Sequence, residues 1–197
     1  MQIKILSRLL GSIPKKPEHL SVSIEKIEEK ASYAESILTF SAYFERSVVD
    51  FSVKAHTPLD KSPKIAVIRF TDSFEENHKL EDGSRALYLI STEEFLKNGK
   101  LTKRARALLY AKKHRGYLPL LSWAAIRVFE YVNSLEDGYD CICVEGNGEL
   151  KKAALLTSLL EQNIILAENN KPTQKNIKER ESKLLELIKE NQSLQNS

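Results

Sequence analysis

The chain has 197 residues, of which 42% are hydrophobic and 29% are charged, and its formal net charge is +3. This composition is typical of a globular domain and excludes a chain that is disordered throughout. No apolar run approaches the roughly 20 residues of a membrane span, so we expect no membrane as a partner. The two cysteines, Cys141 and Cys143, have no partner elsewhere, which predicts a reducing intracellular compartment such as the cytoplasm. The basic N-terminal start lacks the apolar core of a signal peptide, although a mitochondrial-type leader stays open.

The first half of the chain is predicted to contain one helix followed by three strands. Apolar residues recur every three or four positions over residues 17–47, which favours a helix. Runs rich in β-branched and apolar residues then predict strands at 47–55, 64–70 and 85–91. Thr92, which two acids follow, is expected to cap a short helical turn.

The next segment is predicted to form two helices separated by an extended stretch. Residues 102–114 are helix-prone and end before Gly116. Residues 117–123 are expected to be extended, because the residue before Pro119 avoids the helical region. Ser122 would then cap a second helix that carries the single tryptophan into the core.

The last part of the chain predicts a parallel βαβ unit. An apolar strand at 141–144, a helix at 150–163 and a strand at 164–168 follow one another, and such a crossover implies parallel strands with helices over the sheet. The charged tail that follows predicts either a short coiled coil or a helix laid on the domain. We therefore divide the chain into an N-terminal part at 1–60, a core at 61–170 and a helical tail at 171–197, of which residues 173–197 offer a route to a homo- or hetero-oligomer.

A basic segment stands out against an acidic remainder. Residues 97–115 hold eight Lys or Arg and no acid, so the other residues sum to 3 − 8 = −5. Such a segment predicts either a surface that contacts a polyanion or a solvated helix whose basic side chains pair with nearby acidic residues. Charge alone does not separate the two. On the first interpretation, the residues that contact nucleic-acid phosphates are Lys103, Arg104, Arg106, Lys112, Lys113 and Arg115.

Glu145 is the candidate catalytic residue, because it ends a buried strand just before a Gly-Asn-Gly turn. A carboxylate in that position can hold Mg²⁺, but two metals need several fixed acids. The neighbouring strand offers Arg69 instead, a cation that would pair with Glu145 and oppose metal binding. The sequence therefore predicts no metal site and no cofactor, with Mg²⁺ required only if the protein is active.

The runs "YLPLLSWAAIRVFEYV" and "DCICVEGNGELKKAALL" resemble endonuclease V. The resemblance implies an RNase H-like fold, a mixed sheet flanked by helices, and Mg²⁺-dependent cleavage of DNA or RNA near inosine. It implies that a Tyr-x-Pro wedge and a glycine turn contact the flipped base, which is the way such enzymes reach a base. The matching positions are Tyr117, Pro119, Gly146, Asn147, Gly148, Lys151 and Lys152.

The catalytic positions of that family are altered here. Its first-strand aspartate falls near Arg69, its helix glutamate falls near Ala125, and its second aspartate is Glu145. The leading hypothesis is therefore a pseudoenzyme: an inactive nuclease-like domain that binds nucleic acid or serves as a subunit of a nucleic-acid-processing assembly. A protein-interaction module acting through the C-terminal helix is the first alternative. An active Mg²⁺-dependent nuclease that uses Glu145 with Asp72 or Glu130 is the second.

Overall fold

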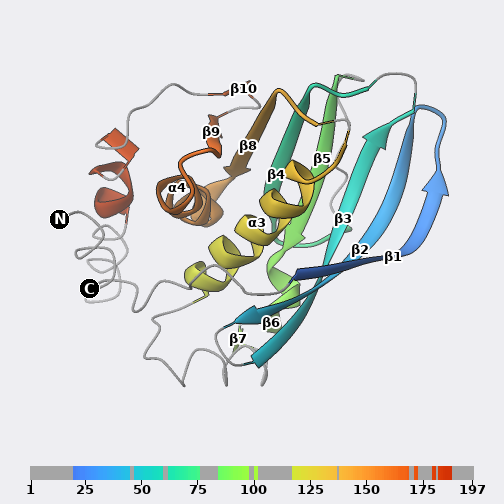
Figure 1. Cartoon of the computed structure of the whole chain (residues 1–197). Coiled ribbons are helices and arrows are strands. Elements are labelled where there is room, and N and C mark those ends of the chain that lie inside the picture. Colours follow the sequence, from blue (N-terminus) through green and yellow to red (C-terminus); the bar gives the residue numbers. More distant parts are fainter. Residues whose placement is uncertain are drawn as a thin grey trace.

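The computed structural model describes residues 20–44, 47–59, 62–75, 84–97, 100–101, 117–136, 138–168, 171–172, 179–180 and 182–187. These residues form one large mixed sheet covered by two helices (Figure 1). The strands are β1 (Leu20–Glu29), β2 (Tyr33–Phe44), β3 (Ser47–Pro58), β4 (Ile65–Thr71), β5 (Arg85–Ser91), β6 (Leu96–Lys97), β7 (Lys100–Leu101), β8 (Cys141–Gly146), β9 (Ile165–Glu168) and β10 (Lys171–Pro172). The helices are α3 (Leu118–Asn133) and α4 (Lys151–Leu160), with 3-10 turns η1 (Thr92–Glu94) and η2 (Gly148–Leu150).

The large sheet has eight strands in the order β1-β2-β3-β5-β4-β8-β9-β10. Strands β1, β2, β3 and β5 pair antiparallel in turn, whereas β5, β4, β8 and β9 are parallel to one another. The order β8, α4, β9 is the parallel crossover that the sequence predicts, and the predicted mixed α/β class is confirmed. Strands β6 and β7 form a separate short ribbon.

The predicted helix over residues 17–47 is wrong, because this segment forms β1 and β2. Within β2, Leu38, Phe40 and Ala42 are buried, whereas the residues between them are only partly buried. This period of two is the burial pattern of a strand, and the stacked pair Phe40–Phe51, with ring centroids 5.1 Å apart, joins β2 to β3. The helical spacing drew on Ile24 and Ile27, which are 56% and 61% exposed and lie outside the main core.

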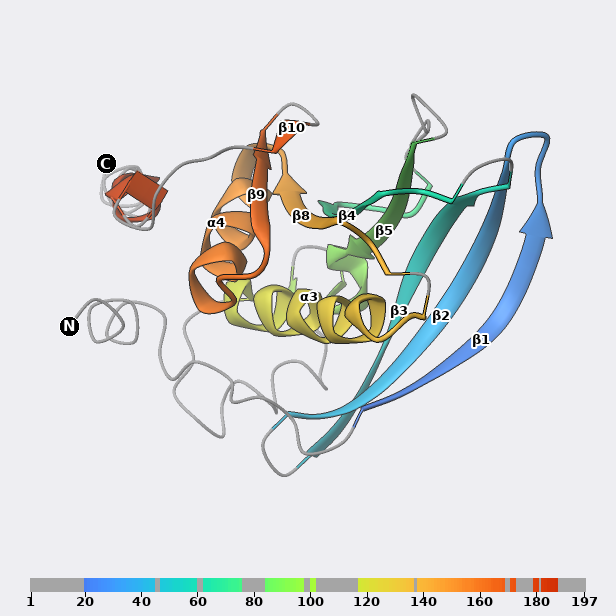
Figure 2. The same ribbon diagram turned by 45° about the horizontal axis from the view of Figure 1, so that its top comes forward.

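The main core lies between the sheet and the two helices, which occupy the same side of it (Figure 2). Strands β1–β3 curve around α3, and Trp123 of α3 packs edge-on against Phe51, with 5.5 Å between ring centroids. The prediction that Trp123 belongs to the core is confirmed, since it is 1% exposed. Ser122 is also buried, and its hydroxyl donates to the Ala153 carbonyl of α4 at 3.3 Å.

The predicted extended stretch around Pro119 is wrong as well. Helix α3 begins at Leu118, four residues before the expected cap at Ser122, and Pro119 lies in its first turn. A proline is tolerated there because the first backbone N–H groups of a helix have no intrahelical acceptor. No side chain caps this end of α3.

The two cysteines of β8 lie on one face of the strand as free thiols, with their sulfur atoms 3.4 Å apart. Burial, followed by the contact with Cys141, raises the pKa of the Cys143 thiol to about 12. Cys143 therefore stays protonated in the folded chain at neutral pH, as a small apolar group of the sheet would.

The described part of the C-terminal tail packs on this domain. Leu184 is fully buried in the main core, and Leu187 lies against it. The Arg180 guanidinium donates to the Ser158 carbonyl of α4 at 2.9 Å. Of the two interpretations of the tail, these residues favour a helix laid on the domain. Ile177 and Leu194 of the expected stripe lie outside the described residues.

Candidate functional site

A sharp strand-to-helix turn joins β8 to α4 at the carboxyl end of the parallel strands. Gly146 ends the strand, Asn147 has an ordinary extended φ of −102°, and Gly148 has a φ of +52° before the backbone enters η2 and α4. A positive φ is costly for residues with a side chain, so glycine at the apex removes that strain. In open sheets of parallel strands, ligands bind outside this end of the strands.

The two arms of the turn touch at Gly146. A Cβ atom on this residue would lie 2.6 Å from the Leu150 carbonyl oxygen, which is closer than any real Cβ contact. Gly146 and Leu150 stand two residues before and after Gly148, so their contact closes the turn around that residue. The Gly-x-Gly pair thus builds the turn itself: the first glycine permits the close approach and the second permits the reversal.

Below the turn, Glu145 is held by Arg69 of the neighbouring strand. The two residues are register partners in β4 and β8, and the Arg69 Nε donates to the Glu145 carboxylate. This is the pairing that the sequence predicts. The ion pair with Arg69 engages the Glu145 carboxylate, which a metal ion would need as a ligand. Among the residues that the structure describes, no group of three or more His, Cys, Asp or Glu could hold a metal ion.

Three further side chains face the same edge of the sheet. Tyr117 precedes α3 and is half-buried; burial, then the nearby Glu149 and Asp72 carboxylates, raise the pKa of its phenol. Asp72 follows β4, and its carbonyl accepts hydrogen bonds from the Ser91 and Thr92 hydroxyls at 2.9 and 3.2 Å. The edge therefore combines one aromatic ring with carboxylates, and its cations Arg69 and Lys152 are paired with Glu145 and Glu149.

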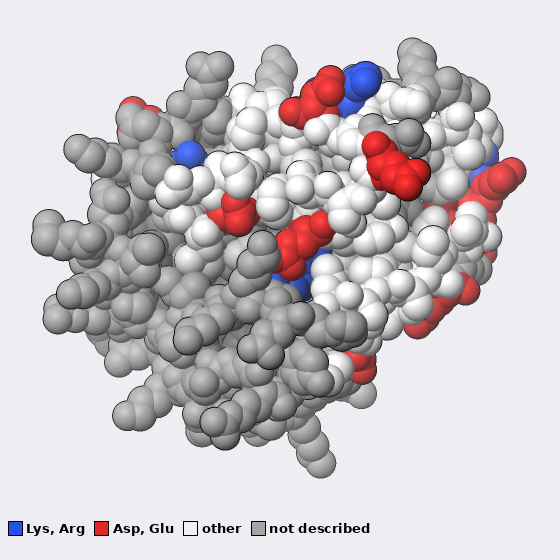
Figure 3. Space-filling model, viewed as in Figure 1, with Lys and Arg blue, Asp and Glu red and all other residues white. Residues whose placement is uncertain are grey.

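The two lysines that were predicted to contact nucleic acid begin α4. Lys152 is buried, and its ammonium donates to the Glu149 carboxylate at 2.6 Å, so it braces the turn from within. Lys151 is half-buried at the first position of the helix. The six residues of the basic segment, Lys103, Arg104, Arg106, Lys112, Lys113 and Arg115, lie outside the described residues. On the face in Figure 3, the described charges form no continuous basic patch, and acidic side chains are scattered across it.

Comparison with known proteins reveals the fold of this chain. No protein-family model and no curated protein matches the sequence. The glucuronoyl esterase catalytic domain from Hypocrea jecorina matches the structure with a TM-score of 0.60 at 18% identity, over 84% of this chain and 45% of that one. A glucuronoyl esterase from Solibacter usitatus matches with a TM-score of 0.60 at 14% identity, over 83% and 55%.

A third solved structure carries a ligand. It is a serine-to-alanine mutant of the glucuronoyl esterase from Sporotrichum thermophile, in complex with methyl 4-O-methyl-β-D-glucopyranuronate. It matches with a TM-score of 0.57 at 17% identity, over 86% of this chain and 47% of that one. This chain thus spans about half the length of these esterases, which are α/β hydrolases.

These matches overturn the resemblance to endonuclease V. The predicted RNase H-like fold is wrong, because the chain shares the fold of esterases over more than four-fifths of its length. The predicted function is wrong for the same reason: the chain is not supported as a degenerate nuclease, or pseudoenzyme of that family, that binds nucleic acid. The alternative of a protein-interaction module acting through the C-terminal helix stays a prediction. The active nuclease is also wrong: Glu145 pairs with Arg69, and Glu130 pairs with Arg127. A buried strand ending in Gly-x-Gly occurs in both folds, which is why the pattern misled.

The turn has a definite meaning in the α/β-hydrolase fold. There the nucleophilic serine sits at the apex of a strained strand-to-helix turn, in a Gly-x-Ser-x-Gly pattern, and the acid and histidine of the triad follow it along the chain. Here the turn between β8 and α4 reads Gly146, Asn147, Gly148, Glu149 and Leu150, so it keeps the first glycine of that pattern and has no serine at its apex. No histidine follows Gly148 in the sequence. His56, the one histidine among the described residues, lies beside Glu35 on β3, separated from β8 by two strands.

Gly146, Asn147 and Gly148, which the resemblance implied would contact a flipped base, form the turn between β8 and α4. A buried strand, two glycines two residues apart and an apolar helix predict a tight strand-to-helix turn, but they do not identify the fold that contains it. A serine at the apex would identify a hydrolase turn, but this chain has Gly148 in that position.

Proposed function

We propose that this chain is a carbohydrate-binding domain of the α/β-hydrolase fold that recognises a neutral uronate ester without cleaving it through a covalent serine step. The observation that carries this proposal is Gly148 at the apex of the turn between β8 and α4. The fold is shared with esterases, whereas no hydroxyl or thiol stands at the apex of this turn.

The chemistry of the turn supports the absence of a covalent step. Ester hydrolysis through an acyl-enzyme needs a hydroxyl or thiol that an adjacent base activates. Gly148 has no side chain, and the Asn147 amide is not a nucleophile. The Glu149 carboxylate is engaged by the buried Lys152 ammonium at 2.6 Å.

The same edge retains groups that suit a sugar ester. The half-buried ring of Tyr117 offers a flat apolar surface for a pyranose, and the Asp72 and Glu149 carboxylates that influence it are acceptors for sugar hydroxyls. Because Glu149 is paired with Lys152, the charge that would repel a free uronate, but not its uncharged methyl ester, is that of Asp72. The ligand of the Sporotrichum thermophile esterase, a methyl glucuronate, is of this uncharged kind.

Covalent labelling tests the proposal. We expect a fluorophosphonate probe, which reacts with activated serines, to leave the intact mass of the wild-type chain unchanged. The Gly148→Ser variant should also stay unlabelled, because a serine at the apex has no downstream histidine to activate it. An adduct on any serine of the wild-type chain would show a nucleophile elsewhere and would overturn the proposal.

A further inference from the structure

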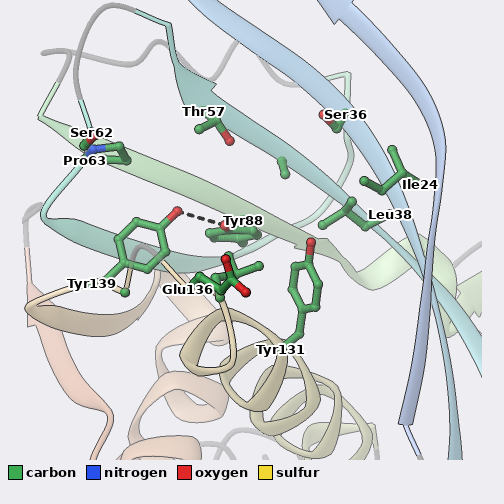
Figure 4. Close-up of a pocket in the computed structure, with 13 residues that line it drawn as sticks. Ile24, Ser36, Leu38, Thr57, Ser62, Pro63, Tyr88, Tyr131, Glu136 and Tyr139 are labelled. Carbon is green, nitrogen blue, oxygen red and sulfur yellow. Dashed lines mark hydrogen bonds between the residues drawn. The ribbon is translucent and has the colours of Figure 1, made fainter.

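A cavity lies at the opposite end of the parallel strands, far from the turn. It has a volume of about 490 Å³ and opens between the end of α3 and the curved strands β1–β3 (Figure 4). Pro63 and Tyr139, which line it, precede β4 and β8, whereas the turn follows β8. The length of β8 therefore separates the two places by about 16 Å. A cavity of this size is in the range of small-molecule sites.

Three tyrosines form the aromatic wall of this cavity. Tyr88 lies on its floor, and Tyr131 and Tyr139 stand on either side of it (Figure 4). The hydroxyls of Tyr88 and Tyr139 are hydrogen-bonded at 3.0 Å, and their rings meet edge to face with centroids 6.5 Å apart. Tyr131 is held in turn by an edge-on contact with Phe40, at 5.6 Å. Three rings from α3, β5 and the segment before β8 thus surround one space.

The three phenols remain neutral at physiological pH. Burial raises the pKa of Tyr88, Tyr131 and Tyr139 above the ordinary value, and the proximity of the other tyrosines adds to the rise for Tyr88. The rings therefore present the negative faces of uncharged aromatic systems, which attract cations.

The remaining electrostatics of the cavity favour a cation too. Glu136 is the one formally charged residue among the thirteen described residues that line it, and its carboxylate lies between Tyr131 and Tyr139 in Figure 4. Helix α3 ends beside the cavity, so its partial negative charge is directed here, and its last turn holds no basic residue. An anionic ligand would meet a carboxylate and the carbonyl end of a helix.

We propose that this cavity binds a small organic ammonium ion, with the positive head between the tyrosine rings and Glu136 and an apolar body against Leu38 and Ala55. The buried Leu38 and Ala55 provide the apolar wall, and the cavity has room for a body larger than the head group. The inference is independent of the proposed uronate-ester site, because it rests on other residues at the other end of the strands.

Two ligands of the same shape test the charge requirement. Choline and 3,3-dimethylbutan-1-ol differ in a single atom, the quaternary nitrogen that a carbon replaces. Calorimetric titration of the full chain should show choline binding with a dissociation constant at least about tenfold lower than that of the alcohol. Equal binding of the two, tighter binding of the alcohol, or no heat from choline up to about 10 mM would overturn the proposal.

Two pairs of variants locate the ammonium head. Tyr131→Phe keeps the ring face and should bind choline as wild type does, whereas Tyr131→Leu should weaken choline about fivefold. Glu136→Gln, an exposed change that leaves the core untouched, should weaken choline but not the alcohol. Thermal unfolding of each variant separates loss of the site from loss of the fold. Unchanged choline binding in both Tyr131→Leu and Glu136→Gln would place the ligand elsewhere.

Discussion

Replacing Gly146 by valine should lower the free energy of unfolding by about 3 kcal/mol or more. The added Cβ would lie 2.6 Å from the Leu150 carbonyl oxygen, and backbone on both arms of the turn must move to admit it. The overlap involves main chain rather than the end of a flexible side chain, so the neighbouring residue has no rotamer that relieves it. Urea denaturation monitored by circular dichroism measures the loss.

Gly148→Ala is the matched control for this prediction. A Cβ on Gly148 would meet no atom within 4 Å, so only the φ of +52° opposes it. The expected cost is about 1–2 kcal/mol, the strain of one left-handed residue. Equal losses in the two variants would mean that close approach at Gly146 does not hold the turn together.

Removing the Glu130 carboxylate should destabilise the chain by about 2–3 kcal/mol. Its partner Arg127 lies in the middle of α3 and is 1% exposed. Burial lowers the pKa of this guanidinium to about 10, and Glu130 opposes that effect. Two contacts of 3.2 Å, from Nε and Nη2 to the two carboxylate oxygens, hold the pair. Glu130→Ala leaves a buried charge without this partner, while the 18% exposure of the carboxylate keeps the loss below that of a fully buried pair.

A double-mutant cycle checks that the loss arises from the stranded charge. Arg127→Met, an apolar change of similar length, should cost less than about 1 kcal/mol, because it removes the charge that burial penalises. Once Arg127 is methionine, Glu130→Ala should have little further effect. Additive losses from Glu130→Ala and Arg127→Met would contradict the coupling.

The sheet was predictable from the sequence where strands are apolar and bounded by turns. The sequence predicted strands β4, β5, β8 and β9 and the crossover through α4. Short β-branched runs favour strands, and the helical repeat between two of them favours a helix. The pairing of Arg69 with Glu145 followed from placing two strands side by side. Strands β1 and β2 were missed, because Ile24 and Ile27 imitate a helical repeat although both side chains are more than half exposed.

The identity of the turn could not be reached in the same way. A buried strand followed by Gly-x-Gly fits a metal-dependent nuclease and a hydrolase elbow alike, and the residues that would separate them are absent in both cases. What separates them is three-dimensional: the positive φ of Gly148, the contact of Gly146 with Leu150, and the order of the strands. None of these can be read from residue spacing.

One nuclear magnetic resonance experiment addresses binding and cleavage together. The chain is mixed with methyl 4-O-methyl-β-D-glucopyranuronate, saturation transfer to the ligand is recorded, and free methanol is followed over time. We expect saturation transfer to the sugar that is kept in Tyr117→Phe and reduced in Tyr117→Ala, with methanol no faster than in buffer. Methanol release above the buffer rate would contradict the loss of the covalent step, and no transfer from the wild-type chain would contradict the binding of the ester.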